Sequence, residues 1–137
     1  MSSYEDKVIR ILRAGSIKFE REKTFKDLQQ GRYRYDFYIP ARGVLIEVDG
    51  EQHWKPVYGR PALLKQKEHD RRKNSYALAH KIPLYRIPFW EIENLKTSKD
   101  LFQKRFLVTT KWWNDLLKVP KSYTYLRKMS LYIGTRR

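Results

Sequence analysis

Two short apolar segments constrain this chain more than any other feature, because each of them carries an acidic residue in its interior. The first is Arg34–Ile39, the second is Val44–Asp49, and Pro40–Gly43 lies between them. Short segments rich in β-branched and aromatic residues, separated by a turn that contains proline and glycine, predict two adjacent strands. We therefore expect a hairpin-like pair of strands in the sheet of this protein.

Asp36 and Glu47 are the acids inside these two strands. Side chains alternate across a strand, so Asp36 should point away from its apolar neighbours at 35, 37 and 39, and Glu47 should share a face with Leu45 and Asp49. If the strands pair, Asp36 and Glu47 meet at the edge of a buried sheet. Two carboxylates there repel each other and are costly to desolvate unless a proton or a cation lies between them. Magnesium prefers such ligands, so the pair predicts a metal site.

Each acid also has an ordinary interpretation when it is taken alone. Carboxylates of a strand often lie on a solvated face, and Asp36 can pair with Arg32 or Arg34. The functional interpretation rests on finding both acids inside strongly apolar strands.

The rest of the chain alternates helical and strand-like segments. Apolar spacing and end signals predict the remaining elements. In chain order they are a helix at Tyr4–Ala14, a strand or its approach at Ile17–Glu20, a loop at Asp27–Arg32, a helix at Ala62–His80 and a short strand at Leu84–Ile87. This order predicts an α/β domain with a mixed central sheet flanked by helices.

The charge of the chain indicates its partner. Thirty Lys and Arg against fifteen Asp and Glu give a net charge of +15, which favours binding to a polyanion such as nucleic acid. The basic residues are spread over the chain and not gathered on one amphipathic helix, so we do not expect a membrane partner. The chain has no cysteine, no apolar run near the ~20 residues of a membrane span and no signal-peptide pattern, so we expect a cytoplasmic protein.

The sequence changes character at Lys96. From there to the end it holds eleven Lys and Arg against two acids, with aromatic residues among them. We predict a core over residues 1–95 and a basic, aromatic-rich extension over residues 96–137 that belongs to the same domain. Lys111 and Trp112 are expected to contact DNA, because aromatic rings among cations suit bases and phosphates. Burial of Trp112 and Trp113 in the core or in a dimer interface is the alternative.

Asp70 interrupts an apolar line of the second predicted helix. It lies seven residues from both Leu63 and Ala77, so it should point toward the sheet and not toward solvent. A buried acid needs a partner, and His53 or Arg71 is available. His69 falls outside this line, so we expect it to be an ordinary surface residue.

Two motifs resemble known nucleases. An Asp followed eleven residues later by a Glu at the end of an apolar strand resembles the metal-binding core of the PD-(D/E)XK nuclease superfamily. The stretches Ser3–Val8, Gly15–Glu20 and Tyr35–Pro40 are similar to phage Holliday-junction resolvases of that superfamily. The resemblance covers roughly residues 3–90 and implies a restriction-endonuclease-like core that uses Mg²⁺, with Mn²⁺ able to substitute. It also implies that Glu5 joins the catalytic acids, although Glu5 can instead form a capping box with Ser2.

The chain departs from that superfamily at Asp49. A lysine usually stands two residues after the Glu, where it orients the attacking water or stabilises charge on phosphorus. The remaining pattern of Glu5, Asp36, His53 and Asp70 resembles the Glu-Asp-His-Asp arrangement of very-short-patch-repair endonucleases and related homing nucleases. That resemblance implies that His53 activates water. A solvent-facing loop histidine is the alternative.

We therefore expect a Mg²⁺-dependent endonuclease that hydrolyses DNA phosphodiesters. Asp36 and Glu47 would hold the metal, with Glu5 and Asp49 as further ligands, and His53 would act as a general base or orient water. The expected catalytic acids thus include Asp70, which fixes the tautomer of His53. The expected phosphate contacts are basic side chains of the loop and the second helix, namely Lys55, Arg71, Arg72 and Lys73.

Three functions remain open at this point. A junction resolvase would cut branched DNA as a symmetric homodimer, and we favour this structure-specific cutting. A mismatch-specific or site-specific nicking or homing endonuclease would read one duplex site instead. The missing lysine leaves a third possibility, an inactive nuclease fold that only binds DNA.

Overall fold

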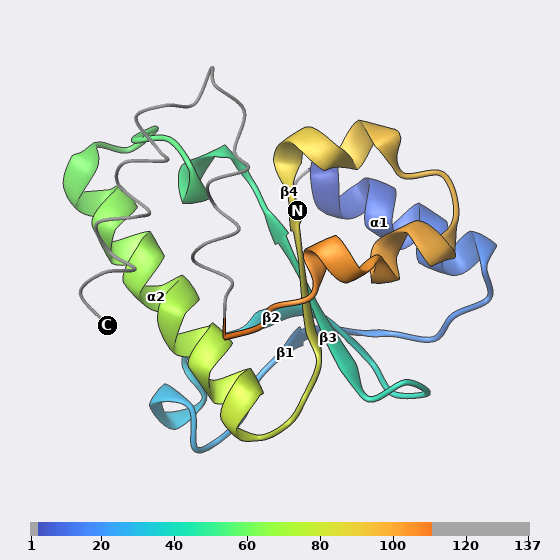
Figure 1. Ribbon diagram of the computed structural model, residues 1–137, viewed down its shortest axis with the longest axis horizontal. Coiled ribbons are helices and arrows are strands. Elements are labelled where there is room, and N and C mark those ends of the chain that lie inside the picture. Colours follow the sequence, from blue (N-terminus) through green and yellow to red (C-terminus); the bar gives the residue numbers. More distant parts are fainter. Residues whose placement is uncertain (1–2, 111–137) are drawn as a thin grey trace.

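The computed structural model describes residues 3–110. Figure 1 shows three layers, with one long helix on one face of a central sheet and a second helix with several short ones on the other face. The helices are α1 (Ser3–Ala14) and α2 (Arg60–Ala79), and the strands are β1 (Glu20–Lys23), β2 (Tyr35–Ile39), β3 (Val44–Asp49) and β4 (Leu84–Pro88). The described part also holds the 3₁₀ helices η1 (Gln29–Gly31), η2 (Glu51–His53), η3 (Phe89–Asn94), η4 (Ser98–Phe102) and η5 (Lys104–Phe106).

The sheet is mixed, as the order of the elements predicted. Its strands follow the order β1-β2-β3-β4. β1 and β2 are antiparallel, as are β2 and β3, and β3 runs parallel to β4. The parallel pair is connected through α2, as parallel strands require a long crossover. The expected α/β domain with a mixed sheet flanked by helices is therefore confirmed.

The turn between β2 and β3 depends on a glycine. Gly43 has a φ of +63°, in the left-handed region that glycine adopts without steric cost. Its N–H donates to the carbonyl of Ile39 at 2.8 Å and closes the turn. This turn fixes the pairing of Ile39 with Val44 and of Phe37 with Ile46.

Side-chain alternation in β3 divides the interior into two clusters. Val44, Ile46 and Val48 pack with α1 and the short helices, whereas Leu45 packs with α2. Both sets are buried, so this strand runs through the centre of the molecule. The faces are those that the period of two predicted. Glu47 and Asp49 share the α2 side with Leu45.

β2 departs from the same simple alternation at its first residue. Phe37 and Ile39 pack on the α1 side, but Tyr35 packs on the α2 side, where its hydroxyl donates to the carbonyl of Lys73 at 2.9 Å. The expectation that the three residues share one face is therefore wrong for Tyr35. At Tyr35 the two strands no longer pair, since Phe37 and Ile46 are the last residues of β2 and β3 that lie opposite each other toward this end.

The described residues after β4 belong to the packed core. Leu101 and Phe106 are buried in the α1-side cluster, and Val108 is buried in the α2-side cluster. Leu107 bridges to Tyr85, and the Val108 N–H donates to the carbonyl of Leu84 at 2.8 Å. The start of the expected basic extension is thus continuous with the core.

Some expectations fall beyond these residues. Lys111, Trp112 and Trp113 lie outside the described part of the chain. Within residues 3–110, no helix combines the length and the apolar character needed to cross a bilayer.

Candidate active site

Asp36 and Glu47 meet where β2 and β3 separate. One more step of the β2–β3 register would place these two residues opposite each other. Instead, the backbone N–H of Asp36 donates to Glu47 Oε1 at 2.7 Å, and the backbone N–H of Val48 donates to Asp36 Oδ2 at 2.7 Å. Each carboxylate thus takes a hydrogen bond that the sheet would otherwise make between backbones. The strand pair opens at this point and holds both acids in place.

The environment of Asp36 disfavours its charged form. Burial raises the pKa of Asp36 well above its ordinary value, and the nearby charges of Glu47 and Glu5 raise it further. The hydrogen bond from Val48 and the charge of Lys73 act in the opposite direction but do not balance these effects. Glu47 itself is only 2% exposed. A site of this kind gains stability from a proton or a cation between the carboxylates.

Lys73 supplies one positive charge to this site from α2. Its Nζ lies 3.0 Å from Glu47 Oε2 and also donates to the carbonyl of Arg34. The side chain of Lys73 is 13% exposed, so the ion pair is largely shielded from solvent. The sequence predicted Lys73 as a phosphate contact, and the structure brings it directly to the acidic pair.

A pocket of about 600 Å³ opens over the acidic pair. Glu5, Asp36, Glu47 and His53 all line it, so four of the five expected catalytic residues face one space. Lys73 lines it as well. The pocket gathers residues from α1, β2, β3, η2 and α2, and it lies within the size range of ligand sites.

Glu5 reaches this pocket from the first turn of α1. Its Oε1 accepts a hydrogen bond from Arg21 at 3.0 Å, which pairs the first helix with β1. Ser2, the partner in the alternative capping box, lies outside the described residues. The carboxylate of Glu5 lies near enough to Asp36 to raise its pKa.

His53 and Asp70 form a buried pair beside the acids. His53 Nδ1 lies 3.0 Å from Asp70 Oδ2 and 3.1 Å from Asp70 Oδ1. Gln66 donates to the same carboxylate at 3.1 Å. Asp70 is fully buried, on the same helical line as Leu63 and Ala77. The predicted direction of Asp70 is therefore confirmed, and its partner is His53.

The surroundings of the pair favour the charged form of both partners. Burial lowers the pKa of His53, but the charges of Asp70 and Asp49 outweigh it, and the pKa lies above its ordinary value of 6.5. Burial would raise the pKa of Asp70, but the charges of His53 and Arg86 hold it far below its usual range. Because Nδ1 faces Asp70, Nε2 is the nitrogen left for the pocket, and it has no hydrogen bond to any of residues 3–110.

Arg86 connects the two halves of the site, and sequence reasoning missed it. Its Nη1 donates to Asp49 Oδ1 at 2.8 Å and lies 3.5 Å from Asp70 Oδ1 and 3.9 Å from Glu47 Oε2. Its Nε donates to Asn74 Oδ1 at 2.6 Å. Arg86 is 3% exposed on β4, a strand that reads as purely apolar apart from this residue. An arginine inside a buried strand was the available signal.

Asp49 binds Arg86 and does not line the pocket. It is 1% exposed, its Oδ1 binds Arg86, and the same oxygen lies 3.5 Å from His53 Nδ1. The residue expected as a further metal ligand thus lies behind the acidic pair, in the layer that supports His53. Asp70 lies in the same layer and also does not line the pocket.

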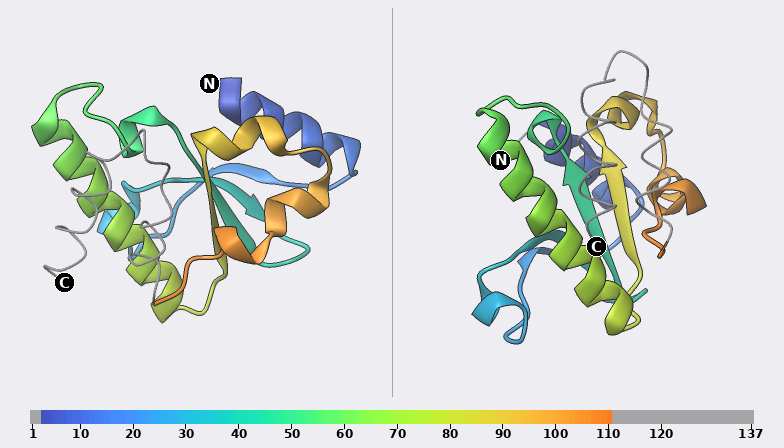
Figure 2. Two further views of the ribbon diagram at one scale, coloured as in Figure 1. Left: turned by 45° about the horizontal axis from the view of Figure 1, so that its top comes forward. Right: turned by 60° about the vertical axis from the view of Figure 1, so that its left-hand side comes forward.

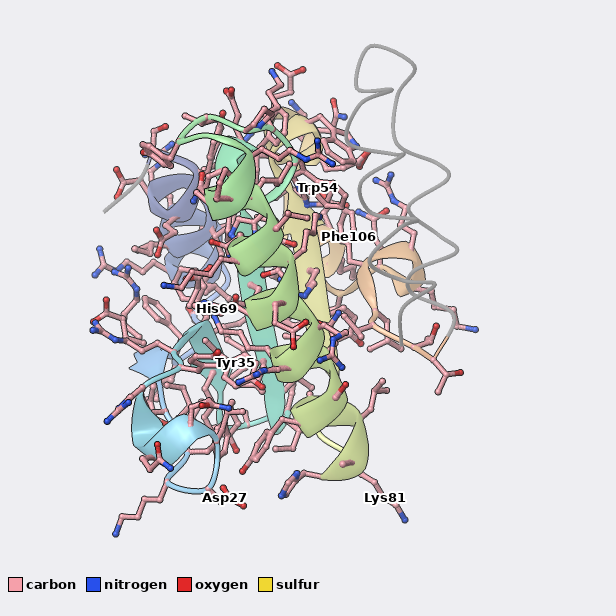
Figure 3. All side chains as sticks on the ribbon, turned by 90° about the vertical axis from the view of Figure 1, so that its left-hand side faces the viewer. Asp27, Tyr35, Trp54, His69, Lys81 and Phe106 are labelled. Atoms are coloured by element: carbon pink, nitrogen blue, oxygen red, sulfur yellow. The ribbon has the colours of Figure 1, made fainter. Side chains whose placement is uncertain are left out.

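Lys67 is a second buried cation that the sequence did not reveal. It is fully buried on α2, and its Nζ has no hydrogen-bond partner among the described residues. The ammonium lies 3.8 Å from the centre of the Trp54 ring, and burial lowers its pKa to about 8. Figure 3 shows Trp54 on the opposite edge of α2 from Tyr35 and His69.

His69 lines the pocket, so the expectation of an ordinary surface residue is wrong. Its ring lies 4.6 Å from that of Tyr33, centre to centre, and it is half-buried. The helical line that excluded it from the sheet face places it on the flank of α2 that borders the pocket. Arg32 and Arg34 also line the pocket and are exposed, so cations flank its entrance. Neither pairs with Asp36, and Arg34 lies 3.5 Å from Glu22 instead.

The other expected phosphate contacts lie off the pocket. Arg71 and Arg72 both bind Glu68 on the surface of α2, and Arg72 Nε lies 3.2 Å from its Oε1. Lys55 Nζ lies 3.6 Å from Glu51 Oε2. Arg72 is exposed and Arg71 and Lys55 are half-buried, and their expected contacts to phosphate stay predictions.

The donor set of the acidic pair suits a hard divalent cation. Glu47 is buried and Asp36 is half-buried, and each offers carboxylate oxygens beside the negative charge of the other. Within residues 3–110, no group of three or more His, Asp or Glu side chains could hold a metal ion. A bound ion would therefore take one or two carboxylates and complete its shell with water and substrate oxygens, as Mg²⁺ commonly does.

Comparison with known protein families, with curated proteins and with solved structures finds no match to this chain. The interpretation of the pocket therefore rests on its own geometry and on the motifs of the sequence.

Proposed function

We propose that this protein is a metal-dependent endonuclease that hydrolyses phosphodiester bonds of DNA. The observation that supports this most is the pair of carboxylates, the buried Glu47 and the half-buried Asp36, held at the opening between two strands and facing a pocket with cations at its entrance. The net charge of +15 supports a polyanionic substrate. Asp36 and Glu47 would hold the metal, and a bound Mg²⁺ would supply Lewis-acid stabilisation of charge on the phosphate.

Lys73 is proposed to take the role of the lysine that is missing at Asp49. Its Nζ lies 3.0 Å from Glu47 Oε2, so it can reach a phosphate oxygen or an attacking water beside the same carboxylate. An ammonium can stabilise negative charge on the phosphate whether its lysine lies on a strand or on a neighbouring helix, because only the position of the ammonium matters. The substitution at Asp49 therefore does not by itself argue for an inactive protein.

His53 is proposed to act as a hydrogen-bond donor to the phosphate. The raised pKa of His53 favours the protonated ring, which suits donation from Nε2 to a phosphate or leaving oxygen better than removal of a proton. Asp70 holds Nδ1 and so fixes the orientation of the ring. In this proposal Glu5, which accepts a hydrogen bond from Arg21, forms part of the pocket wall on the side of α1.

Cleavage of a labelled four-way junction and of its matched linear duplex, with Mg²⁺ and with EDTA, tests the proposal. Wild type should cut the junction or the duplex when Mg²⁺ is present and neither of them in EDTA. Asp36→Asn should cut at least ~100-fold more slowly than wild type while it binds DNA at least as tightly as wild type does. Asp6→Asn is the matched control, because Asp6 lies next to Glu5 on α1 but does not line the pocket. Cleavage by Asp36→Asn at the wild-type rate would overturn the proposed site.

The two substrates and the EDTA arm also separate the remaining functions. Cutting of the junction supports a resolvase, whose symmetric action on two strands implies a homodimer. Cutting of the duplex supports a mismatch-specific or site-specific enzyme. Tight binding of wild type to DNA without any cutting would replace the enzyme by a DNA-binding protein on a nuclease-like fold.

A further inference from the structure

A second pocket adjoins the candidate active site and shares Tyr4 with it. Its volume is about 460 Å³, and Tyr4, Lys7 and Arg10 of α1 form one side. Glu51 of η2 and the residues Phe89, Trp90, Ile92 and Glu93 of η3 form the rest. Figures 1 and 2 show η3 running beside the N-terminal half of α1. Because Tyr4 lines both pockets and Glu5 follows it, the two spaces are direct neighbours.

Aromatic rings form much of the wall of this pocket. The rings of Tyr4 and Phe89 lie 6.3 Å apart, and those of Phe89 and Trp90 lie 5.2 Å apart at 82°. All three side chains are half-buried, so each keeps part of its surface open. Such rings are the surfaces on which unpaired nucleobases stack.

Charged side chains line the same pocket. Lys7 and Arg10 provide cations on α1, and the Nζ of Lys7 is held by the carbonyl of Glu93 at 3.2 Å. Cations here can bind the phosphate that accompanies a base. Glu51 and Glu93 provide carboxylates, which accept hydrogen bonds from the exocyclic amino group of a base such as cytosine.

We propose that this second pocket receives one unstacked nucleotide of the DNA strand that enters the candidate active site. The proposal rests on the function proposed above, and it adds a substrate class, DNA that contains an unpaired nucleotide. A base that is already unpaired enters such a pocket at little cost, whereas a base of an intact duplex must first be unpaired and unstacked. The shared wall at Tyr4 places this nucleotide next to the phosphate that Asp36 and Glu47 face.

Binding measured without metal tests this proposal independently of cleavage. In EDTA, fluorescence anisotropy compares a duplex carrying one unpaired cytosine with the same duplex fully paired. Wild type should bind the first about tenfold more tightly, the effect expected of one stacked base. Phe89→Leu should remove most of this preference and leave the affinity for the paired duplex unchanged. Phe102→Leu is the matched control, because Phe102 is a half-buried aromatic residue of η4 outside both pockets.

A second variant covers the case in which Phe89→Leu fails to fold. Arg10 is exposed on α1, so Arg10→Ala should fold, and it should weaken binding of the unpaired duplex more than Arg13→Ala does. Equal affinity of wild type for the two duplexes would overturn the proposal, as would an equal loss for both duplexes in Phe89→Leu. If wild type binds the unpaired duplex more tightly but cuts neither DNA, only the proposed enzyme activity is overturned.

Discussion

Replacing Asp70 with asparagine should reverse the pH dependence that His53 gives to folding stability. In wild type the pKa of His53 lies above 6.5, because the charges of Asp70 and Asp49 outweigh burial. A base whose pKa is raised on folding stabilises the protein fully below its unfolded pKa. That contribution is lost as the pH rises through the higher folded pKa. Wild-type stability should therefore fall as the pH rises from about 6.5 to the folded pKa.

Asparagine keeps the size of the side chain but removes its charge. Burial is the largest single influence on His53, and in the variant only Asp49 acts against it, so the pKa should fall below 6.5. The contribution of His53 to folding stability is then complete above pH 6.5 and is lost as the pH falls through the lowered pKa. Each unit of difference in pKa changes the free energy of unfolding by ~1.4 kcal/mol. Removing one partner of this fully buried pair should also cost about 3–5 kcal/mol at neutral pH.

Two measurements check this prediction. NMR titration follows the three histidines of the chain, and urea unfolding gives stability on both sides of pH 6.5. Asp27→Asn is the matched control, because Asp27 lies 3.3 Å from His80 in an exposed pair and its loss should cost at most ~1 kcal/mol. A His53 pKa above 6.5 in Asp70→Asn, or below it in wild type, would refute the reasoning.

Three further substitutions have expected outcomes. Lys73→Met removes the ammonium 3.0 Å from Glu47 and should slow Mg²⁺-dependent DNA cleavage by roughly 100-fold or more, and an unchanged single-turnover rate would contradict its role. Arg86→Met leaves the charge of Asp49 unpaired in the interior and should lower the free energy of unfolding by about 3–5 kcal/mol, and a loss below ~1 kcal/mol in urea unfolding would contradict this. Lys67→Met removes a buried ammonium without a hydrogen bond to the described residues and should stabilise the protein by about 1–3 kcal/mol at neutral pH. That gain should shrink above pH 8, because the folded wild type releases the proton of Lys67 at a lower pH than the unfolded chain does and becomes more stable as a result. A gain that stays constant with pH would show that the pKa of Lys67 is not lowered.

The local patterns of the sequence were enough for α1, α2, β2, β3 and β4 and for part of the site, but they placed the first strand at Ile17–Glu20, whereas β1 spans Glu20–Lys23. The alternation in β3 predicted that Val44, Ile46 and Val48 share a buried face and that Glu47 lies on the other. The seven-residue spacing in α2 predicted that Asp70 points inward with Leu63. Both inferences need only the geometry of one strand or one helix, which repeats along the chain and is therefore visible in the order of residues.

The partners of these residues were decided by the packing of α2 across the sheet. Lys73 reaches Glu47 from 26 positions along the chain, and Arg86 reaches Asp49 from 37. No periodicity connects such residues, and Lys67 and Asn74 are buried although their residue types predict exposure. The packed helix and sheet exclude water, so the buried charges of Glu47, Asp49 and Asp70 meet opposite charges from other elements, whereas the ammonium of Lys67 lies against the Trp54 ring. The acids and the histidine could thus be named from the sequence, but the network that sets their charges exists only in the folded protein.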